Sequence, residues 1–203
     1  MIVAVEGPSG AGKTTWCQQH VSSFVEEYAV TGVEPDGSDL TAQARFWIAV
    51  NSRRWKAAQA LEARSGTAVC DGDPLKLHYS WCLSRIGAAP WVRFEQELAH
   101  ARQAFALGVL GFVDLVLISI PSPTALTGRH QADSTRRRRS FALHRQLAEP
   151  LTTWYQAVDA LDPGRVIWQF PDEGVPQASR GPRDQRSDPA LLDGLIALLP
   201  PRG

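Results

Sequence analysis

The stretch Gly7-Pro8-Ser9-Gly10-Ala11-Gly12-Lys13-Thr14 decides the fold of this 203-residue chain. It matches the phosphate-binding pattern GxxxxGK[ST] at every fixed position. An apolar run precedes it and a helical pattern follows, which is the strand, loop and helix order that the motif requires. Glycines let successive N–H groups turn inward and hold phosphate oxygens in front of a helix N-terminus. The sequence therefore predicts a nucleotide-binding loop.

The loop residues receive individual roles from this pattern. Lys13 is expected to bridge the β- and γ-phosphates of ATP, and the Thr14 hydroxyl to ligate Mg²⁺. The chain has no NKxD for guanine and no DxxG after the third predicted strand, which argues against a switch GTPase. The predicted nucleotide-binding residues are Gly7, Ser9, Gly10, Ala11, Gly12, Lys13, Thr14 and Thr15.

Short apolar runs alternate with helical patterns along the chain. Such runs are typical of strands buried on both faces of a parallel sheet. The predicted strands are Ile2–Val5, Ala29–Val33, Thr67–Cys70, Val113–Ile120 and Val166–Phe170, and the predicted helices are Thr14–Glu26, Thr41–Arg64, Leu75–Ile86, Phe94–Leu107 and Ser134–Leu161. The alternation predicts an α/β, three-layer P-loop NTPase fold with a five-stranded parallel sheet and helices on both faces.

The length predicts one P-loop kinase-like domain over residues 1–203. Residues 171–189 are rich in Pro, Gly, Ser and charge, which predicts a mobile loop. A C-terminal helix over residues 189–199 is expected to follow, with Asp188 as its N-cap and Pro189 at its first position.

Composition excludes several classes of protein. The chain carries 21 basic and 21 acidic residues, so bulk attraction to nucleic acid or to an anionic membrane is not expected. Cys17, Cys70 and Cys82 form no CxxC pair and have no His at metal-ligand spacing, which predicts reduced thiols rather than a zinc site. We expect no signal peptide, no membrane span and a cytoplasmic location, and the sequence leaves a homodimer open.

Two carboxylates, Asp71 and Asp73, follow the third predicted strand. The carboxyl edge of an open α/β sheet is where its ligands bind. A carboxylate there orients Mg²⁺ through water or accepts the proton of an attacking hydroxyl. We therefore predict Asp71 as a catalytic and metal-binding residue and Asp73 as a second catalytic one. The alternative for Asp73 is a structural role as N-cap of the helix that Pro74 opens.

With these residues in place, the chain resembles the thymidylate kinase and deoxynucleoside kinase group of P-loop phosphotransferases. The stretch Val5–Thr15 is similar to their first strand and loop, and Gly32–Gly37 to the Glu-Pro-Gly turn after their second strand. The aromatic-to-Arg stretch Phe46–Arg54 and the lid entry Pro123–Arg129 complete the likeness. The resemblance covers roughly residues 1–160 and implies that Glu34, Arg53 and Arg54 contact the acceptor.

One departure from the family concerns the acceptor. Thymidylate kinases have Asp-Arg after the third strand, where the Arg helps to hold the transferring phosphoryl group or the acceptor phosphate. Here Gly72 follows Asp71. The departure indicates an acceptor without a phosphate, and Asp-x-Asp at this edge is similar to kinases that phosphorylate the hydroxyl of a nucleoside or other small molecule.

An arginine-rich segment over residues 129–145 is predicted to form a lid. It closes over ATP and brings cationic groups to the charge that develops on the γ-phosphoryl oxygens. Arg129 is predicted to bind the nucleotide, and Arg136 and Arg139 to act in catalysis because a spacing of three places both on one helix face. The alternatives are a solvated helix face and an RNA contact.

Aromatic residues gather in the half of the chain expected to hold the acceptor. Phe46 and Trp47 lie ahead of Arg53, and Tyr79 and Trp81 lie after Asp73. Aromatic faces stack on bases, so these four are predicted substrate contacts, with core packing as the alternative for each.

Taken together, the sequence predicts an ATP- and Mg²⁺-dependent kinase of a small acceptor, most simply a nucleoside or nucleotide. Three alternatives stay open. The first is a kinase of a sugar or antibiotic hydroxyl, and the second is a polynucleotide 5′-end kinase that uses the arginine segment as a backbone clamp. The third is a regulatory module that binds ATP and has no acceptor.

Overall fold

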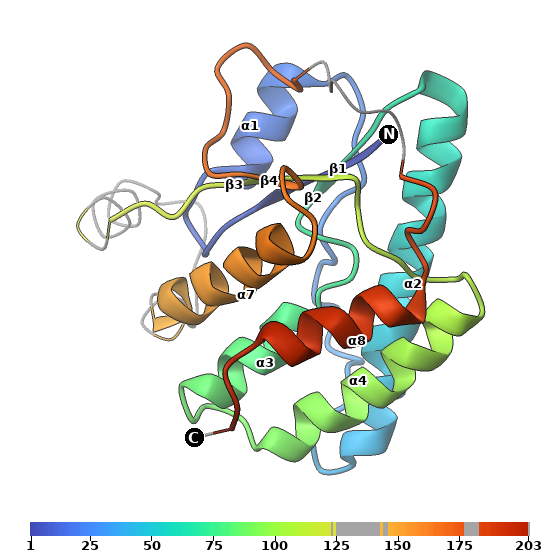
Figure 1. Ribbon diagram of the computed structural model, residues 1–203, viewed down its shortest axis with the longest axis vertical. Coiled ribbons are helices and arrows are strands. Elements are labelled where there is room, and N and C mark those ends of the chain that lie inside the picture. Colours follow the sequence, from blue (N-terminus) through green and yellow to red (C-terminus); the bar gives the residue numbers. More distant parts are fainter. Residues whose placement is uncertain (123, 125–142, 144–145, 177–182, 203) are drawn as a thin grey trace.

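A computed structural model describes residues 1–122, 124, 143, 146–176 and 183–202 of the chain. Strands and helices alternate along it (Figure 1). The order is β1 Ile2–Glu6, α1 Lys13–His20, α2 Leu40–Ser65, β2 Ala68–Asp71, α3 Leu77–Arg85, α4 Trp91–Ala106, β3 Leu115–Ile118, α7 Ala148–Leu161, β4 Val166–Ile167 and α8 Pro189–Leu198.

The described strands form one parallel sheet in the order β2-β1-β3-β4. In β1, Ile2 and Ala4 belong to one apolar core, while Val3 and Val5 belong to the other. Alternate side chains of a strand point to opposite faces, so the sheet is buried on both faces. The predicted α/β fold with helices on both faces of a parallel sheet is confirmed, but the described sheet has four strands rather than five.

The predicted strand Ala29–Val33 is wrong. Val30 and Val33 are 77% and 76% exposed, so this apolar run lies outside the core. The place beside β2 is instead taken by a single bridge between Val25 and Cys70. The Val25 N–H donates to Val69 O at 2.8 Å, and its carbonyl accepts from Asp71 N at 2.8 Å. The chain therefore reaches the carboxyl edge of the sheet at Glu26, not after Val33.

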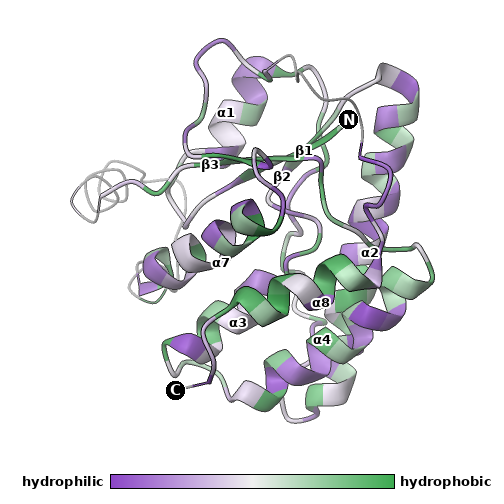
Figure 2. Cartoon of the chain, in the orientation of Figure 1, coloured by the Kyte–Doolittle hydropathy of each residue, from purple (hydrophilic) through white to green (hydrophobic). Residues whose placement is uncertain are grey.

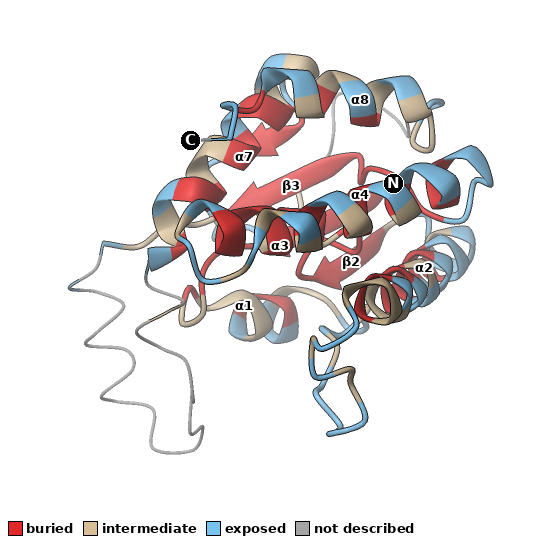
Figure 3. Ribbon diagram, turned by 90° about the horizontal axis from the view of Figure 1, so that it is seen from below, coloured by how far each residue is buried: buried red, intermediate tan, exposed pale blue. Residues whose placement is uncertain are grey.

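Helices cover the two faces unequally. Trp16 and Cys17 of α1 cover one face, and the larger core on the other face is built from α2, α3, α4, α7 and α8 (Figure 1). The labelled strands are buried, whereas each helix is buried on one side and exposed on the other (Figure 3). Hydropathy follows the same division, with apolar strands and helices of mixed character (Figure 2). The sheet therefore forms a rigid base from which its carboxyl edge presents polar side chains.

The start of β3 is tied to the segment before α8 by an ionic network around Asp114. The Asp114 carboxylate is 4% exposed and accepts hydrogen bonds from the backbone of Ile2 at 2.6 Å and of Arg183 at 2.9 Å. Arg186 donates to Asp114 from Nε at 2.8 Å and binds both carboxylate oxygens of Glu62 on α2. Asp114 thus joins β1, β3 and the described end of the loop predicted over residues 171–189.

We expect Asp114→Ala to lower the free energy of unfolding by about 3–5 kcal/mol, because it leaves two backbone N–H groups without their acceptor and takes one of its two carboxylate partners from the partly buried Arg186 guanidinium. Urea denaturation followed by circular dichroism measures the change. Asp193→Ala is the matched control, since its ion pair with Arg102 is exposed on both sides. Removing that pair should cost about 0–1 kcal/mol. Equal losses for the two variants would show that the Asp114 network does not stabilise the fold.

None of the helices in the part of the chain that the structure describes is long and apolar enough to cross a bilayer.

Candidate functional site

The loop between β1 and α1 has the close packing expected of a phosphate-binding loop. A Cβ on Gly7 would lie 2.4 Å from the carbonyl oxygen of Ser119, so only glycine fits there. The Lys13 ammonium donates to the carbonyl of Gly7 at 2.9 Å and lies across the loop. Helix α1 starts at Lys13, so its N-terminus points at the space that the loop encloses.

Thr14 and Asp71 lie together beside this loop. The Thr14 hydroxyl donates to Asp71 Oδ2 at 2.6 Å, although 57 residues separate the two in sequence. Asp71 Oδ1 is buried and has no hydrogen-bond partner among the described residues. Burial raises the pKa of the Asp71 carboxyl, and the bond from Thr14 acts against this rise. A hydroxyl and a buried carboxylate oxygen without a partner suit a hard cation such as Mg²⁺.

Asp73 occupies a different environment from Asp71. Its Oδ1 accepts from the backbone of Leu75 at 2.9 Å, and its Oδ2 accepts from the Tyr155 hydroxyl at 3.1 Å. Burial raises the pKa of Asp73 to about 6. Both oxygens are engaged and Asp73 does not line the cavity described below, so its contacts are structural and hold the turn before α3. The N-cap alternative for Asp73 is wrong in detail, because α3 begins at Leu77 with Lys76 as its N-cap.

One cavity of about 350 Å³ starts at the phosphate-binding loop and continues between α2, α3 and α4. That volume lies in the range of small-molecule sites. Its lining residues are Glu6, Gly7, Pro8, Ser9, Lys13, Glu27, Tyr28, Val30, Trp47, Val50, Asn51, Arg54, Lys76, His78, Tyr79, Cys82, Arg93, Glu97, Leu147 and Leu151. Among the predicted site residues, those that reach the cavity are Gly7, Ser9, Lys13, Trp47, Arg54 and Tyr79.

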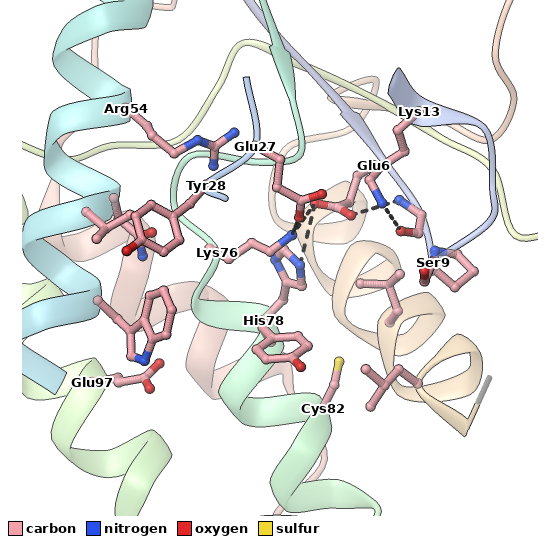
Figure 4. A pocket seen from close by; sticks show the side chains of 18 of the residues that line it. Glu6, Ser9, Lys13, Glu27, Tyr28, Arg54, Lys76, His78, Cys82 and Glu97 are labelled. Atoms are coloured by element: carbon pink, nitrogen blue, oxygen red, sulfur yellow. Dashed lines mark hydrogen bonds and ion pairs between the residues drawn. The ribbon is translucent and has the colours of Figure 1, made fainter. Parts of the chain in front are cut away.

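Four charged or titratable residues meet in the middle of the cavity (Figure 4). The Lys76 ammonium lies 2.7 Å from a Glu27 carboxylate oxygen and 3.8 Å from Glu6, and His78 Nε2 lies 3.6 Å from Glu6. Burial lowers the pKa of His78 to about 4, so its ring is neutral at pH 7. The cluster therefore consists of two carboxylates and one ammonium beside Lys13.

The two carboxylates of this cluster are held ionised. Burial by itself raises the pKa of Glu6, but Lys76, His78 and Lys13 together outweigh it and hold that pKa at about 2. Glu6 also accepts from the backbone of Gly7 and of Asp73, each at 2.9 Å. Burial opposes ionisation of Glu27 as well, yet Lys76 keeps its pKa well below the usual range. Glu27 is the more exposed of the two, with 41% of its side chain accessible, so it faces an incoming ligand.

Helix α2 positions the loop that follows β2. The buried Arg54 guanidinium donates to the carbonyls of Asp71 at 2.6 Å and of Gly72 at 2.8 Å. It also donates to the carbonyls of Glu26 at 3.0 Å and Asp73 at 3.2 Å. Arg54 thus ties together two neighbouring backbone segments, the one at Glu26 and the one from Asp71 to Asp73. Arg53, which the resemblance also implies as an acceptor contact, is exposed and does not line the cavity.

The far end of the cavity is lined by aromatic and polar side chains. Tyr28, Trp47 and Tyr79 line it, and Trp47 Nε1 is buried without a hydrogen-bond partner in the described part of the chain. Glu97 and Arg93 of α4 form an ion pair there at 3.1 Å. Burial raises the pKa of Glu97, while bonds from Ser80 and Arg93 lower it. This end offers flat faces, hydrogen-bond donors and one acceptor.

Besides Arg53, three more of the predicted acceptor contacts lie elsewhere. Glu34 does not line the cavity, because its carboxylate is bound to the backbone of Thr31 at 2.7 Å and to the Tyr28 hydroxyl at 2.7 Å. It closes the local turn and fixes Tyr28. Trp81 is 2% exposed and packs on Trp154 in the core, which is the alternative role that the sequence left open for it. Phe46 lies behind the lining, in edge contact with Tyr28 and Trp47.

The predicted lid residues lie outside the described residues. Arg129, Arg136 and Arg139 belong to the segment 125–142. Their assignment to a lid stays a prediction.

Sequence reasoning missed Glu6, Glu27, Lys76 and Glu97 as cavity residues. A signal for Glu27 was present, because Glu26-Glu27 follows the apolar pair Phe24-Val25 as carboxylates follow a strand end. Glu97 had no signal apart from its helical spacing from Arg93, which is also typical of a surface pair.

The fold is similar to that of solved kinases. Three structures of deoxyadenosine kinase from M. mycoides match the chain. The one with bound dATP is 16% identical with a TM-score of 0.55, over 85% of this chain and 93% of that chain. The one with products dCMP and a flexible dCDP is 12% identical with a TM-score of 0.55, over 83% and 89%. The one with bound dCTP is 14% identical with a TM-score of 0.56, over 85% and 92%.

Neither of the two sequence comparisons found a match: no protein-family model matches the chain, and no curated protein matches it. At 12–16% identity, the structural matches establish the fold.

Proposed function

We propose that the chain is an ATP- and Mg²⁺-dependent phosphotransferase that moves the γ-phosphoryl group to a hydroxyl of a nucleoside or nucleotide. One observation carries this proposal: a single cavity joins the phosphate-binding loop, an exposed carboxylate and an end lined by aromatic side chains. A regulatory ATP-binding module has no need of the second and third features. The deoxyadenosine kinase structures of similar fold hold dATP, dCTP and dCMP, which supports an acceptor of this class.

In the proposed reaction, Glu27 acts as general base. The acceptor hydroxyl oxygen forms a bond to the γ-phosphorus, the bond from that phosphorus to the bridging oxygen breaks, and ADP leaves. The hydroxyl proton passes to the Glu27 carboxylate, whose position between the loop and the aromatic end suits this transfer. Lys13 and the loop N–H groups hold the phosphates, so catalysis is mainly positioning and neutralisation of charge.

Thr14 and Asp71 are the proposed holders of Mg²⁺. Asp71 Oδ1 is buried beside the Thr14 hydroxyl and has no partner among the residues that the structure describes, which fits a cation that is bound partly through water. When bound there, Mg²⁺ would neutralise part of the charge on the phosphates. Arg129, Arg136 and Arg139 complete the proposal as cations delivered by a lid.

The proposal is tested by measuring ADP release with a panel of acceptors. The panel contains deoxynucleosides, nucleoside monophosphates, simple sugars, an aminoglycoside and a 5′-hydroxyl oligonucleotide. Strong stimulation by one nucleoside or nucleotide is the expected result. Stimulation by a sugar or the aminoglycoside would favour a kinase of a sugar or antibiotic hydroxyl over the proposed function. Salt-sensitive stimulation by the oligonucleotide would favour a polynucleotide 5′-end kinase. ATP binding without stimulation by any compound would leave the regulatory module.

We expect Glu97→Gln to raise KM for the acceptor by about tenfold or more and to change kcat little. Glu97 lies at the aromatic end of the cavity, far along the lining from the loop, so it contacts the acceptor in the ground state and the transition state alike (Figure 4). A buried side chain that accepts a hydrogen bond from the substrate contributes strongly to substrate binding, so its loss weakens binding markedly. Glu95→Gln on the exposed side of α4 is the matched control. Equal KM values for both variants would place the acceptor elsewhere.

A further inference from the structure

A side chain at position 72 would point into the charged cluster of the cavity, which consists of Glu6, Glu27, Lys76 and His78. A Cβ on Gly72 would lie 3.4 Å from the Lys76 ammonium nitrogen, 3.5 Å from a Glu27 oxygen and 3.6 Å from a Glu6 oxygen. The sheet edge therefore aims this position at the cluster, but glycine supplies no group. The cation found there comes from Lys76, four residues later.

Lys76 reaches the cluster from an unfavourable backbone conformation. Within the described residues, it is the one non-glycine residue with a positive φ, at 49°. A lysine gains nothing locally in the left-handed region, because its side chain forms no bond to its own turn that offsets the steric cost. Such strain persists only where the surroundings enforce it, and it is typical of functional sites.

The surroundings that enforce this turn come from α2. Asn51 donates to the carbonyl of Leu75 at 2.8 Å, immediately before Lys76. Arg54 holds the carbonyls of Asp71, Gly72 and Asp73. The whole connection from β2 to α3 is therefore fixed, and the ammonium is delivered to one place.

That place is beside the proposed base, on the cavity that the phosphate-binding loop also lines. Lys76 lines the same cavity as Lys13, with 25% of its side chain accessible (Figure 4). It pairs closely with Glu27 at 2.7 Å and loosely with the buried Glu6 at 3.8 Å. A flexible four-carbon stem lets the ammonium exchange one anionic partner for another over a short distance.

We propose that Lys76 is a catalytic residue that stands in for the cation absent at position 72, binding the transferring phosphoryl oxygens and freeing Glu27 as base. This inference rests on the proposed function. Without substrates, the ammonium holds Glu27. With ATP and acceptor bound, it turns to the γ-phosphoryl oxygens, and Glu27 takes the acceptor hydroxyl proton as the new P–O bond forms and the bond to ADP breaks. The buried Glu6 keeps the ammonium charged in both positions.

Removal of the Lys76 ammonium is expected to change the pH dependence of kcat. The titratable and charged groups that interact with Glu27 are Glu6 from β1, Lys13 from α1, Arg54 from α2, Asp71 from β2, and Lys76, His78 and Tyr79 from the start of α3. Glu27 must be a carboxylate to act, so kcat falls as the pH drops through its pKa. Lys76 lowers that pKa, so its removal should move the acidic limb of the kcat profile to higher pH, by about one unit or more.

The test compares Lys76→Asn and Lys76→Arg with the wild-type enzyme and its best acceptor. Asparagine tolerates the left-handed backbone, so Lys76→Asn removes the charge without adding strain. We expect it to lower kcat by about 100-fold, to shift the acidic limb upward and to keep the thermal stabilisation by ATP. Lys76→Arg should retain at least about a tenth of the wild-type kcat. Lys56→Asn, on the exposed side of α2, is the matched control and should leave kcat and the pH profile unchanged.

The outcomes separate the two proposals. Wild-type protein that transfers phosphate to no acceptor overturns the proposed function and this inference with it. An active wild type whose Lys76→Asn variant keeps kcat within about threefold, with the same acidic limb, overturns the inference alone. A third outcome would also overturn the inference. Lys76→Asn would lose the thermal stabilisation by ATP and Lys76→Arg would keep it, while the molecules that still bind ATP would have the same kcat in both variants. Lys76 would then have a structural role rather than a catalytic one.

Discussion

Glu27→Gln is expected to lower kcat by about 10²–10⁴-fold with the best acceptor, which is the usual contribution of a general base. The amide is isosteric with the carboxylate but cannot take up the hydroxyl proton. Glu27 lies 2.7 Å from Lys76 in the middle of the cavity, between the phosphate-binding loop and the aromatic end. The variant loses transition-state stabilisation rather than binding, so the affinity for ATP should stay near that of the wild type.

Steady-state ADP release and ATP-dependent thermal stabilisation measure the two quantities separately. Glu26→Gln is the matched control, because Glu26 is the exposed neighbour that holds Arg54 through its backbone carbonyl only. It should behave as the wild type. If Glu27→Gln turns over within threefold of the wild type, the carboxylate is not the base and the proposed step fails.

The parts of the site that the sequence predicted are those set by local order along the chain. A phosphate-binding loop needs a strand, a run of glycines and a helix, all within the first 20 residues. Asp71 follows the same logic, since a carboxylate after a buried strand lies at the edge where parallel strands end. Its contact with Thr14 follows from the pairing of β1 with β2.

The parts that the sequence could not predict depend on packing between distant segments. Glu27 reaches the cavity because Val25 forms one bridge to Cys70, and a single bridge leaves no run of alternating residues to detect. Arg53 and Arg54 differ by about 100° around α2, and only the packed helix shows which one faces inward. Lys76 depends on a left-handed turn that α2 enforces from outside, which no local preference of lysine indicates.

Lys13→Ala is expected to abolish most of the thermal stabilisation by ATP. Its ammonium lies across the loop at 2.9 Å from Gly7 O, where a triphosphate would replace the carbonyl as its partner. A 100-fold loss of affinity at saturating ATP removes about 2.7 kcal/mol of ligand-linked stability. For a chain of this length, that corresponds to a fall of roughly 5–10 °C in the Tm measured with ATP, at about 2–4 °C per kcal/mol. The Tm without ATP should hardly change.

Thermal denaturation with and without ATP measures this effect, and Lys56→Ala on the exposed side of α2 controls for the loss of one positive charge. If ATP raised the Tm of Lys13→Ala as much as that of the wild type, the loop would not be the phosphate-binding site. Combined with Glu27→Gln, the result also separates the function classes. Lys13→Ala disables ATP binding in a kinase and in a regulatory module alike. Glu27→Gln spares ATP binding in both, and it costs turnover only where a hydroxyl must give up its proton.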